Sequence, residues 1–115
     1  MSIQTKLETL SNALVSEFTV ENKVTLDIYH YFRPSQNPPY IVWEETADRG
    51  LGADNARDDQ AIRGTLDYFT KTEFDGNVDK IQSALESSGA AWYLNSVQFE
   101  DETNLIHYEW IWEVG

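Results

Sequence analysis

The last extended run of the chain, residues 105–114, alternates between two kinds of side chain. Its even-numbered members, from Ile106 to Val114, are all apolar or aromatic, and two of them are tryptophans. The odd-numbered positions between them hold His107, Glu109, Ile111 and Glu113, three of which are polar. Neighbouring side chains of a strand point to opposite faces, so one face of this strand belongs in a core. The chain therefore needs a sheet with a second layer over one face.

Two segments have the period of an amphipathic helix and can supply that layer. Large apolar residues recur three or four positions apart over residues 3–17, and again from about residue 74 or 76 to 88. Ser2 is a suitable N-cap for the first helix, and Gly89 stands where a left-handed cap would end the second. The core residues expected from the two helices are Leu7, Leu10, Leu14, Val78, Ile81 and Leu85.

Extended runs occupy most of the remaining chain. They are rich in β-branched and aromatic residues, and an acidic turn at 100–104 joins the last of them to the terminal strand as a hairpin. All three prolines fall within residues 34–39, where they form a stiff connection into the next strand. Besides 105–114, the predicted strands are 40–45, 61–71, 92–99 and 24–32, and the first part of 24–32 could instead be a loop.

These elements predict one α+β domain over residues 1–115. The element order is α-β-β-β-α-β-β. We expect a largely antiparallel or mixed sheet of about five strands, with both helices packed on one face.

Composition excludes several classes of function. The chain has 20 acidic against 8 basic residues and a net charge of −12, which disfavours binding to a phosphate backbone. It has no cysteine, which excludes disulfides, thiolate zinc sites and cysteine nucleophiles. No apolar run approaches the roughly 18 residues that span a bilayer, so we expect a soluble protein with no membrane partner.

Residues 46–60 form a long polar segment without periodicity. They contain two glycines, two arginines and four aspartates, and a single large apolar residue. Loops this long in a small domain are usually functional, so we expect a flexible loop that contacts a partner. A hairpin end that contacts nothing is the alternative. The candidate partner-binding residues are Arg49, Leu51, Asp54, Arg57, Asp58 and Asp59.

The chain lacks a pattern typical of catalysis. His30 and His107 fall inside predicted strands, and neither begins a metal-ligand spacing. His107 shares a strand face with two glutamates that could join it at a metal, but a solvated polar face is the commoner arrangement. Glu44 and Glu45 are adjacent on a strand, so they point to opposite faces and cannot share a proton. We expect no enzyme, no cofactor and no metal.

The charges are unevenly distributed along the chain. No Lys or Arg occurs from Gln82 to Gly115, whereas four arginines lie between residues 33 and 63. An acidic part beside an arginine-bearing loop suits contacts with charged proteins. The aromatic fraction of 13% also exceeds what a small core readily hides, which indicates an assembly surface. Solubility through net charge is the alternative explanation.

Three segments carry a resemblance to a known family. They are Pro-Pro-Tyr-Ile-Val-Trp-Glu-Glu at 38–45, Leu-Asp-Tyr-Phe-Thr-Lys at 66–71, and Phe-Glu-Asp-Glu-Thr-Asn-Leu-Ile-His-Tyr-Glu-Trp at 99–110. In this order and spacing, the chain resembles the small tail-completion, or tail terminator, proteins of long-tailed bacteriophages and prophages. It departs from their pattern in its high tryptophan content and its very acidic hairpin.

The resemblance implies a structural protein of the virion, without catalysis or a cofactor. Such proteins cap the finished tail tube as a ring, typically a hexamer, end its polymerisation and offer a docking surface to the head–neck complex. The implied partners are other copies of the chain, the tail tube protein and the head–neck connector protein. DNA is only cargo that passes through the lumen. The implied locations are the host cytoplasm during assembly and then the head–tail junction of the virion.

Other functions remain open. A head-completion or connector protein of the neck belongs to the same structural class. An acidic protein of this size could instead mimic DNA and inhibit a nuclease, which would require carboxylates spaced like phosphates on one face. An enzyme would require a deep pocket with convergent polar groups.

Overall fold

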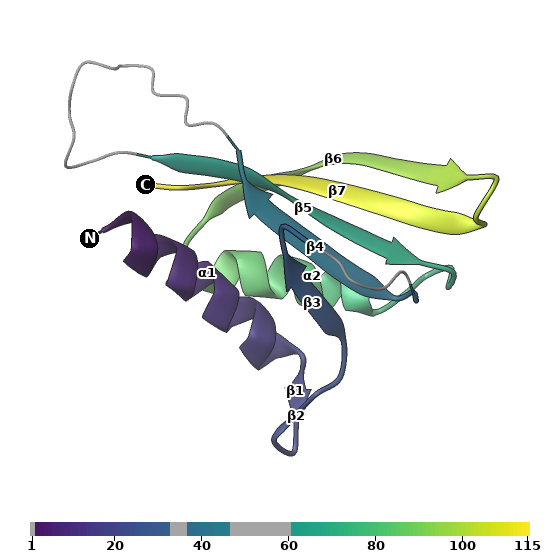
Figure 1. Cartoon of the computed structure of the whole chain (residues 1–115), viewed down its shortest axis with the longest axis horizontal. Helices are drawn as coiled ribbons and strands as arrows, with labels where there is room; N and C mark the ends of the chain where they lie inside the picture. Colours follow the sequence, from purple (N-terminus) through teal and green to yellow (C-terminus); the bar gives the residue numbers. More distant parts are fainter. Residues whose placement is uncertain (1, 33–36, 47–60) are drawn as a thin grey trace.

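Two helices cover one face of a five-stranded sheet in the computed structural model, which describes residues 2–32, 37–46 and 61–115 (Figure 1). This confirms the predicted α+β fold. The elements are α1 (Ile3–Glu17), β1 (Thr19–Val20), β2 (Lys23–Val24), β3 (Asp27–His30), β4 (Tyr40–Glu45), β5 (Ile62–Thr70), α2 (Asn77–Ser87), β6 (Ala91–Glu100) and β7 (Leu105–Val114).

The main sheet is mixed, with the strand order β3-β4-β5-β7-β6. Its neighbouring strands are antiparallel, except that β3 and β4 are parallel. β3 and β6 therefore form opposite edges of the sheet. β1 and β2 pair separately as a small hairpin below α1 (Figure 1).

Both helix caps agree with the sequence prediction. The Ser2 Oγ accepts a hydrogen bond from the Thr5 N–H at 3.1 Å, which satisfies one of the free donors of the first turn of α1. After α2, Gly89 has a φ of 86°, the left-handed conformation that glycine adopts without steric cost.

The predicted strand 24–32 was wrong in its extent. Glu21 and Asn22 both have positive φ, 51° and 69°, and form a two-residue turn that folds β2 back onto β1. The strand that joins the main sheet begins at Asp27 and ends at His30, because Tyr31 also has a positive φ, of 74°. Turn geometry at both ends has shortened a run whose composition favours a strand.

The core is centred on Trp110 and Trp112 of β7, both fully buried. Gly64 of β5 lies opposite Trp112, and a Cβ at this glycine would collide with the Trp112 indole and with the carbonyl oxygen of Glu44. The indole N–H of Trp112 donates to the carbonyl oxygen of Thr65 at 2.9 Å. Glycine at position 64 therefore makes the space in which the indole lies.

Tryptophan N–H groups also attach α2 to the sheet. Trp110 donates to Gln82 Oε1 at 3.1 Å, and Trp92 donates to Glu86 Oε1 at 2.9 Å. The two acceptors are four residues apart and so lie on the same side of the helix. Two adjacent strands, β6 and β7, thus fix the position of α2.

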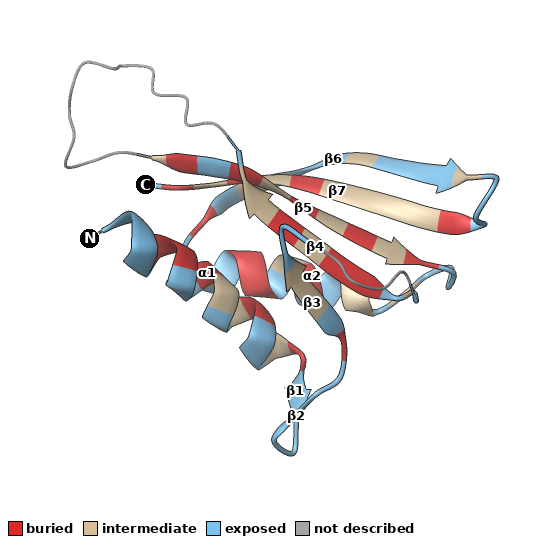
Figure 2. Cartoon of the chain, in the orientation of Figure 1, coloured by how far each residue is buried: buried red, intermediate tan, exposed pale blue. Residues whose placement is uncertain are grey.

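The predicted helix stripes are confirmed as core. Leu7, Leu10 and Leu14 of α1 are buried with Ile81 and Leu85 of α2. Figure 2 shows buried residues in both helices. Val78 packs against the margin of the same cluster.

Truncation of either helix stripe should destabilise the domain. Leu10→Ala or Ile81→Ala is expected to lower the free energy of unfolding by about 2–5 kcal/mol, because each side chain is fully buried and leaves a cavity. Urea unfolding followed by tryptophan fluorescence measures the loss. Val15→Ala, at an exposed position of α1, is the control and should change stability by less than ~0.5 kcal/mol. An equally small loss at Leu10 would contradict the assigned packing face.

Candidate functional site

The predicted partner-binding residues of the long loop lie outside the described residues. Their contact with a partner therefore stays a prediction, for Arg49, Leu51, Asp54, Arg57, Asp58 and Asp59. Two other surfaces of the described chain have unusual chemistry. One is the edge strand β6, and the other is a groove beside α1.

β6 is a long edge strand that lacks the usual protection against pairing. It bonds to β7 and to no other described strand, so its outer edge offers free backbone N–H and C=O groups. No charged residue occurs from Ala91 to Phe99. Proteins usually guard such edges with charges, above all lysine, or cover them. This edge is therefore suited to contact with another chain.

Three apolar side chains of β6 share the helix-facing side of the sheet, because their partners on β7 are Trp110, Tyr108 and Ile106. Leu94, Val97 and Phe99 are 42%, 50% and 59% exposed, respectively, and we call them the apolar strip. The β6–β7 hairpin extends past the ends of the helices, and the outer half of β6 is largely exposed (Figures 1 and 2). The strip has the composition of a protein contact surface.

A register shift in β6 brings the strip onto one face. Leu94 lies opposite Trp110 and Val97 lies opposite Tyr108, which leaves Asn95 as an extra residue between them. The Asn95 side-chain amide donates to Glu109 Oε1 at 2.9 Å. This arrangement is a β-bulge, in which one added residue changes which side chains face each way.

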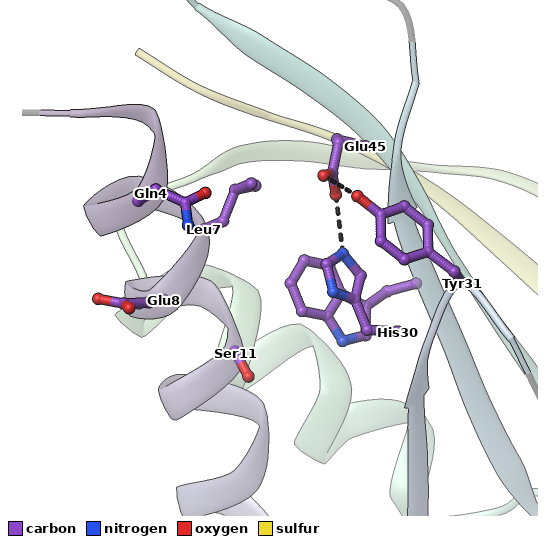
Figure 3. A pocket seen from close by; sticks show the side chains of 8 residues that line it. Gln4, Leu7, Glu8, Ser11, His30, Tyr31 and Glu45 are labelled. Carbon is purple, nitrogen blue, oxygen red and sulfur yellow. Dashed lines mark hydrogen bonds and ion pairs between the residues drawn. The ribbon is translucent and has the colours of Figure 1, made fainter.

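The second surface is a groove of about 280 Å³ between α1 and the ends of β3 and β4 (Figure 3). One wall comes from α1 and the other from the two parallel strands. The lining residues are Gln4, Leu7, Glu8, Ser11, His30, Tyr31, Trp43 and Glu45.

The strand wall of the groove is a stack of three rings that ends at a carboxylate. The His30 imidazole lies between Tyr31 and Trp43, with ring centroids 3.9 Å away on each side and near-parallel planes. The parallel register places His30 directly beside Trp43. Glu45 accepts a hydrogen bond from His30 Nε2 at 2.8 Å and another from the Tyr31 hydroxyl.

The hydrogen bonds at Glu45 set its protonation and that of Tyr31. Partial burial raises the pKa of Glu45, but the bonds from Tyr31 and His30 outweigh it, so that the pKa lies below the ordinary value. The bond to Glu45 raises the pKa of Tyr31 to about 12. At neutral pH the groove therefore contains an ionised carboxylate and a protonated phenol.

Tyr31 reaches this position through a strained turn. Its φ is 74°, and the Phe32 N–H donates to the His30 carbonyl oxygen at 2.9 Å across it, which makes a γ-turn. A non-glycine residue in this conformation costs on the order of 1–3 kcal/mol and persists where surrounding contacts hold it. Here the Tyr31 N–H also donates to the Trp43 carbonyl oxygen at 3.0 Å.

The possible metal grouping at His107 does not form. His107 Nε2 lies 2.9 Å from Asp67 Oδ1, and its Nδ1 lies 3.4 Å from Glu100 Oε2. The ring stacks on Phe69 at 4.2 Å. Within residues 2–32, 37–46 and 61–115, no three histidine, aspartate or glutamate side chains lie together as metal ligands would.

The sequence predicted none of the groove. In the sequence, His30 falls inside a predicted strand without a metal-ligand spacing, and Glu45 is notable only as the neighbour of Glu44. The ring stack depends on the parallel alignment of β3 with β4 and on the turn at Tyr31. The sequence signal that was available is the aromatic run around His30, which exceeds the needs of a short strand.

No family model matches the chain, and no curated protein matches it. Among the described helices, none is long and apolar enough to cross a membrane. Function is therefore inferred from the sequence resemblance and from the two surfaces.

The ion pair between His107 and Asp67, on the sheet face opposite the helices, should be visible in a titration of His107. The hydrogen bond to Asp67 raises the pKa of His107 above its ordinary 6.5, despite the opposing effect of burial, and Glu100 and Glu109 add to the increase. Asp67→Asn should bring the pKa of His107 down toward 6.5, measured by NMR of the imidazole protons. Asp79→Asn removes the same charge from an exposed site on α2 and should leave His107 unchanged.

The raised pKa of His107 also makes the stability of the fold depend on pH. A pKa raised on folding stabilises the native state fully below pH 6.5, and this contribution is lost as pH rises through the folded value. The stability difference between the wild type and Asp67→Asn should therefore be larger at pH 6 than at pH 9. A difference that grows with pH would contradict the assignment.

Proposed function

We propose that this chain is the subunit of a bacteriophage tail terminator. Copies of it form a ring on the end of the tail tube, end tube polymerisation and present a docking surface to the head–neck complex. The sequence resemblance over 38–45, 66–71 and 99–110 supports this function. The subunit is free in solution before it joins the tail.

The observation that carries the proposal is the uncharged edge of β6 with its apolar strip. An exposed strand edge of this kind lowers the solubility of the protein unless a partner covers it. In a ring of more than two subunits, each subunit contacts the next through two different patches. β6 and β3 lie at opposite edges of the sheet. The β6 edge of one subunit can therefore contact the opposite side of the next subunit, and this contact can repeat around a ring.

The charge of the chain suits a ring that DNA crosses. The second half of α2 and the whole β6–β7 hairpin contain no lysine or arginine. Like charges repel, so a wall of this composition would not retain the phosphates of passing DNA. The same charge distribution is compatible with a neck protein, because DNA also passes through the ring that such a protein forms.

A charge placed in the apolar strip tests the subunit contact. Val97→Asp should weaken the contact by at least about tenfold, since it buries an unpaired carboxylate in an apolar interface. In the phage that encodes the chain, we expect over-long tails that fail to join heads, counted by electron microscopy. Val24→Asp is the matched control. This residue is a strand valine of similar exposure, 54% against 50%, on the β1–β2 hairpin.

The outcomes separate the alternative functions. Tails of normal length that lack heads would indicate a neck protein instead. Normal infectious particles from Val97→Asp would remove β6 from the subunit contact. If the chain stays monomeric when it is mixed with tail tubes and also inhibits a nuclease, the proposal is overturned in favour of a DNA mimic.

The loop arginines provide a further test that rests on the sequence alone. The double change Arg49→Ala with Arg57→Ala should barely alter the melting temperature of the free subunit, because the loop has too few apolar residues to build a core. Arginine pairs well with carboxylates at interfaces, so tails made with this variant should be over-long or fail to join heads. Normal particles would exclude the loop arginines from the mechanism.

A further inference from the structure

His107 lies between two carboxylates that belong to the strands on either side of its own. Its Nε2 is 2.9 Å from Asp67 Oδ1 of β5, and its Nδ1 is 3.4 Å from Glu100 Oε2 at the end of β6. β5 and β6 are not neighbours in the sheet, because β7 separates them. The His107 ring therefore links two strands that do not pair with each other.

A ring with a carboxylate at each nitrogen suits only one protonation state. A neutral imidazole has a single N–H, so its other nitrogen presents a lone pair. A lone pair is repelled by a carboxylate oxygen, whereas the imidazolium has a proton on both nitrogens. We propose that protonated His107 is a clamp that holds the end of the β6–β7 hairpin to β5, and that loss of its proton opens this clamp.

The charges around His107 make the loss of its proton costly. Among the described residues, the charged groups that influence its titration are Asp67 on β5, Glu100 on β6 and Glu109 on β7, and all three are acidic. No lysine or arginine occurs in residues 82–115. When the ring becomes neutral, three carboxylates therefore remain near one another without the positive charge that lay between them.

The uncharged neighbours of His107 favour its charged form as well. The ring stacks on Phe69 of β5, with centroids 4.2 Å apart, and the face of an aromatic ring attracts a cation. Gln98 of β6 lies opposite His107 in the antiparallel register. The imidazole is half-buried in this setting, so solvent screens its ion pairs only in part.

The end of the hairpin closes through Glu100. This residue is the last of β6, and its carbonyl oxygen accepts a hydrogen bond from the Asn104 N–H at 2.8 Å across the turn. The hairpin extends past both helices at this end, so the turn depends on contacts within the sheet (Figure 1). A contact at the Glu100 carboxylate is therefore well placed to keep the turn closed.

The direction of the pH response follows from these contacts. The hydrogen bond to Asp67 raises the pKa of His107 above its ordinary 6.5, and Glu100 and Glu109 add to this increase against the opposing effect of burial. The clamp is therefore mostly closed at pH 6. It opens as the pH rises through the raised pKa, because the stabilisation by the proton is lost there.

The clamp also affects the β6 edge. Phe99 of the apolar strip directly precedes Glu100. A strand end that is already held in one conformation loses less entropy when it makes a contact. If β6 is the subunit contact, assembly is therefore favoured below the pKa of His107. This consequence rests on the proposed function, whereas the clamp itself is a property of the free subunit.

Amide hydrogen exchange of the free subunit measures the clamp. The probe is the Asn104 N–H, followed by NMR and expressed as a protection factor, which removes the intrinsic effect of pH on exchange. We expect its protection to fall about two- to fivefold from pH 6 to pH 9, the size of effect that a partly exposed ion pair produces. The Ser88 N–H, bonded to the Ala84 carbonyl oxygen at 3.0 Å at the end of α2, is the reference and should change little.

Two glutamates of the same hairpin separate the clamp from a general effect of charge. Glu100→Gln removes the carboxylate that faces Nδ1 and leaves the pair with Asp67. Asn104 should then have low protection at both pH values, while His107 still titrates. Glu102→Gln removes the same charge from an exposed position of the turn and should retain the pH dependence of the wild type.

Two results would overturn the proposal. The first is a protection of Asn104 in the wild type that stays constant or rises from pH 6 to pH 9. The second is the same pH dependence in Glu100→Gln and Glu102→Gln, which would reduce the effect to net charge. These measurements use the free subunit, so their outcome is independent of ring formation, which Val97→Asp tests separately.

Discussion

The packing of the Trp112 indole over Gly64 is the contact on which the rest of the domain depends. A side chain at position 64 would separate β5 from β7, because the indole lies where a Cβ would stand. When β7 packs against β5 in this way, Trp110 is fully buried and its indole N–H donates a hydrogen bond to Gln82 of α2. α1 packs beside α2 and closes the same core with its leucine stripe. A buried tryptophan contributes roughly 3–5 kcal/mol over alanine, so two adjacent ones dominate so small a core.

Local periodicity predicted much of this fold, whereas the candidate surfaces depend on non-local pairing. The helix stripe around Leu10 and the alternation toward Val114 are visible in the sequence because each is set within one element. The groove needs His30 beside Trp43, and that alignment arises only when β3 pairs in parallel with a strand that follows the proline segment. The early strand was misjudged because two positive-φ residues at the β1–β2 turn redirected the chain, and neither is glycine.

The two candidate surfaces differ in the chemistry of recognition and lie toward opposite edges of the sheet. At the β6 edge, open backbone groups and apolar side chains favour contact through burial, with little dependence on charge. At the β3–β4 edge, the surface is aromatic and polar, with Glu45 held by hydrogen bonds from His30 and Tyr31. The fully buried tryptophans between them keep the sheet rigid, so occupation of one edge need not deform the other.

The β-bulge at Asn95 makes β6 unusually tolerant of a one-residue deletion. A one-residue deletion within a regular strand turns every later side chain to the opposite face, which a half-buried strand rarely survives. In β6 the register already contains the extra residue, so loss of Asn95 would restore the regular ladder and leave Val97 and Phe99 on their present face. Deletion of Asn95 would thus shorten β6 by one residue while the chemistry of its surface stays the same.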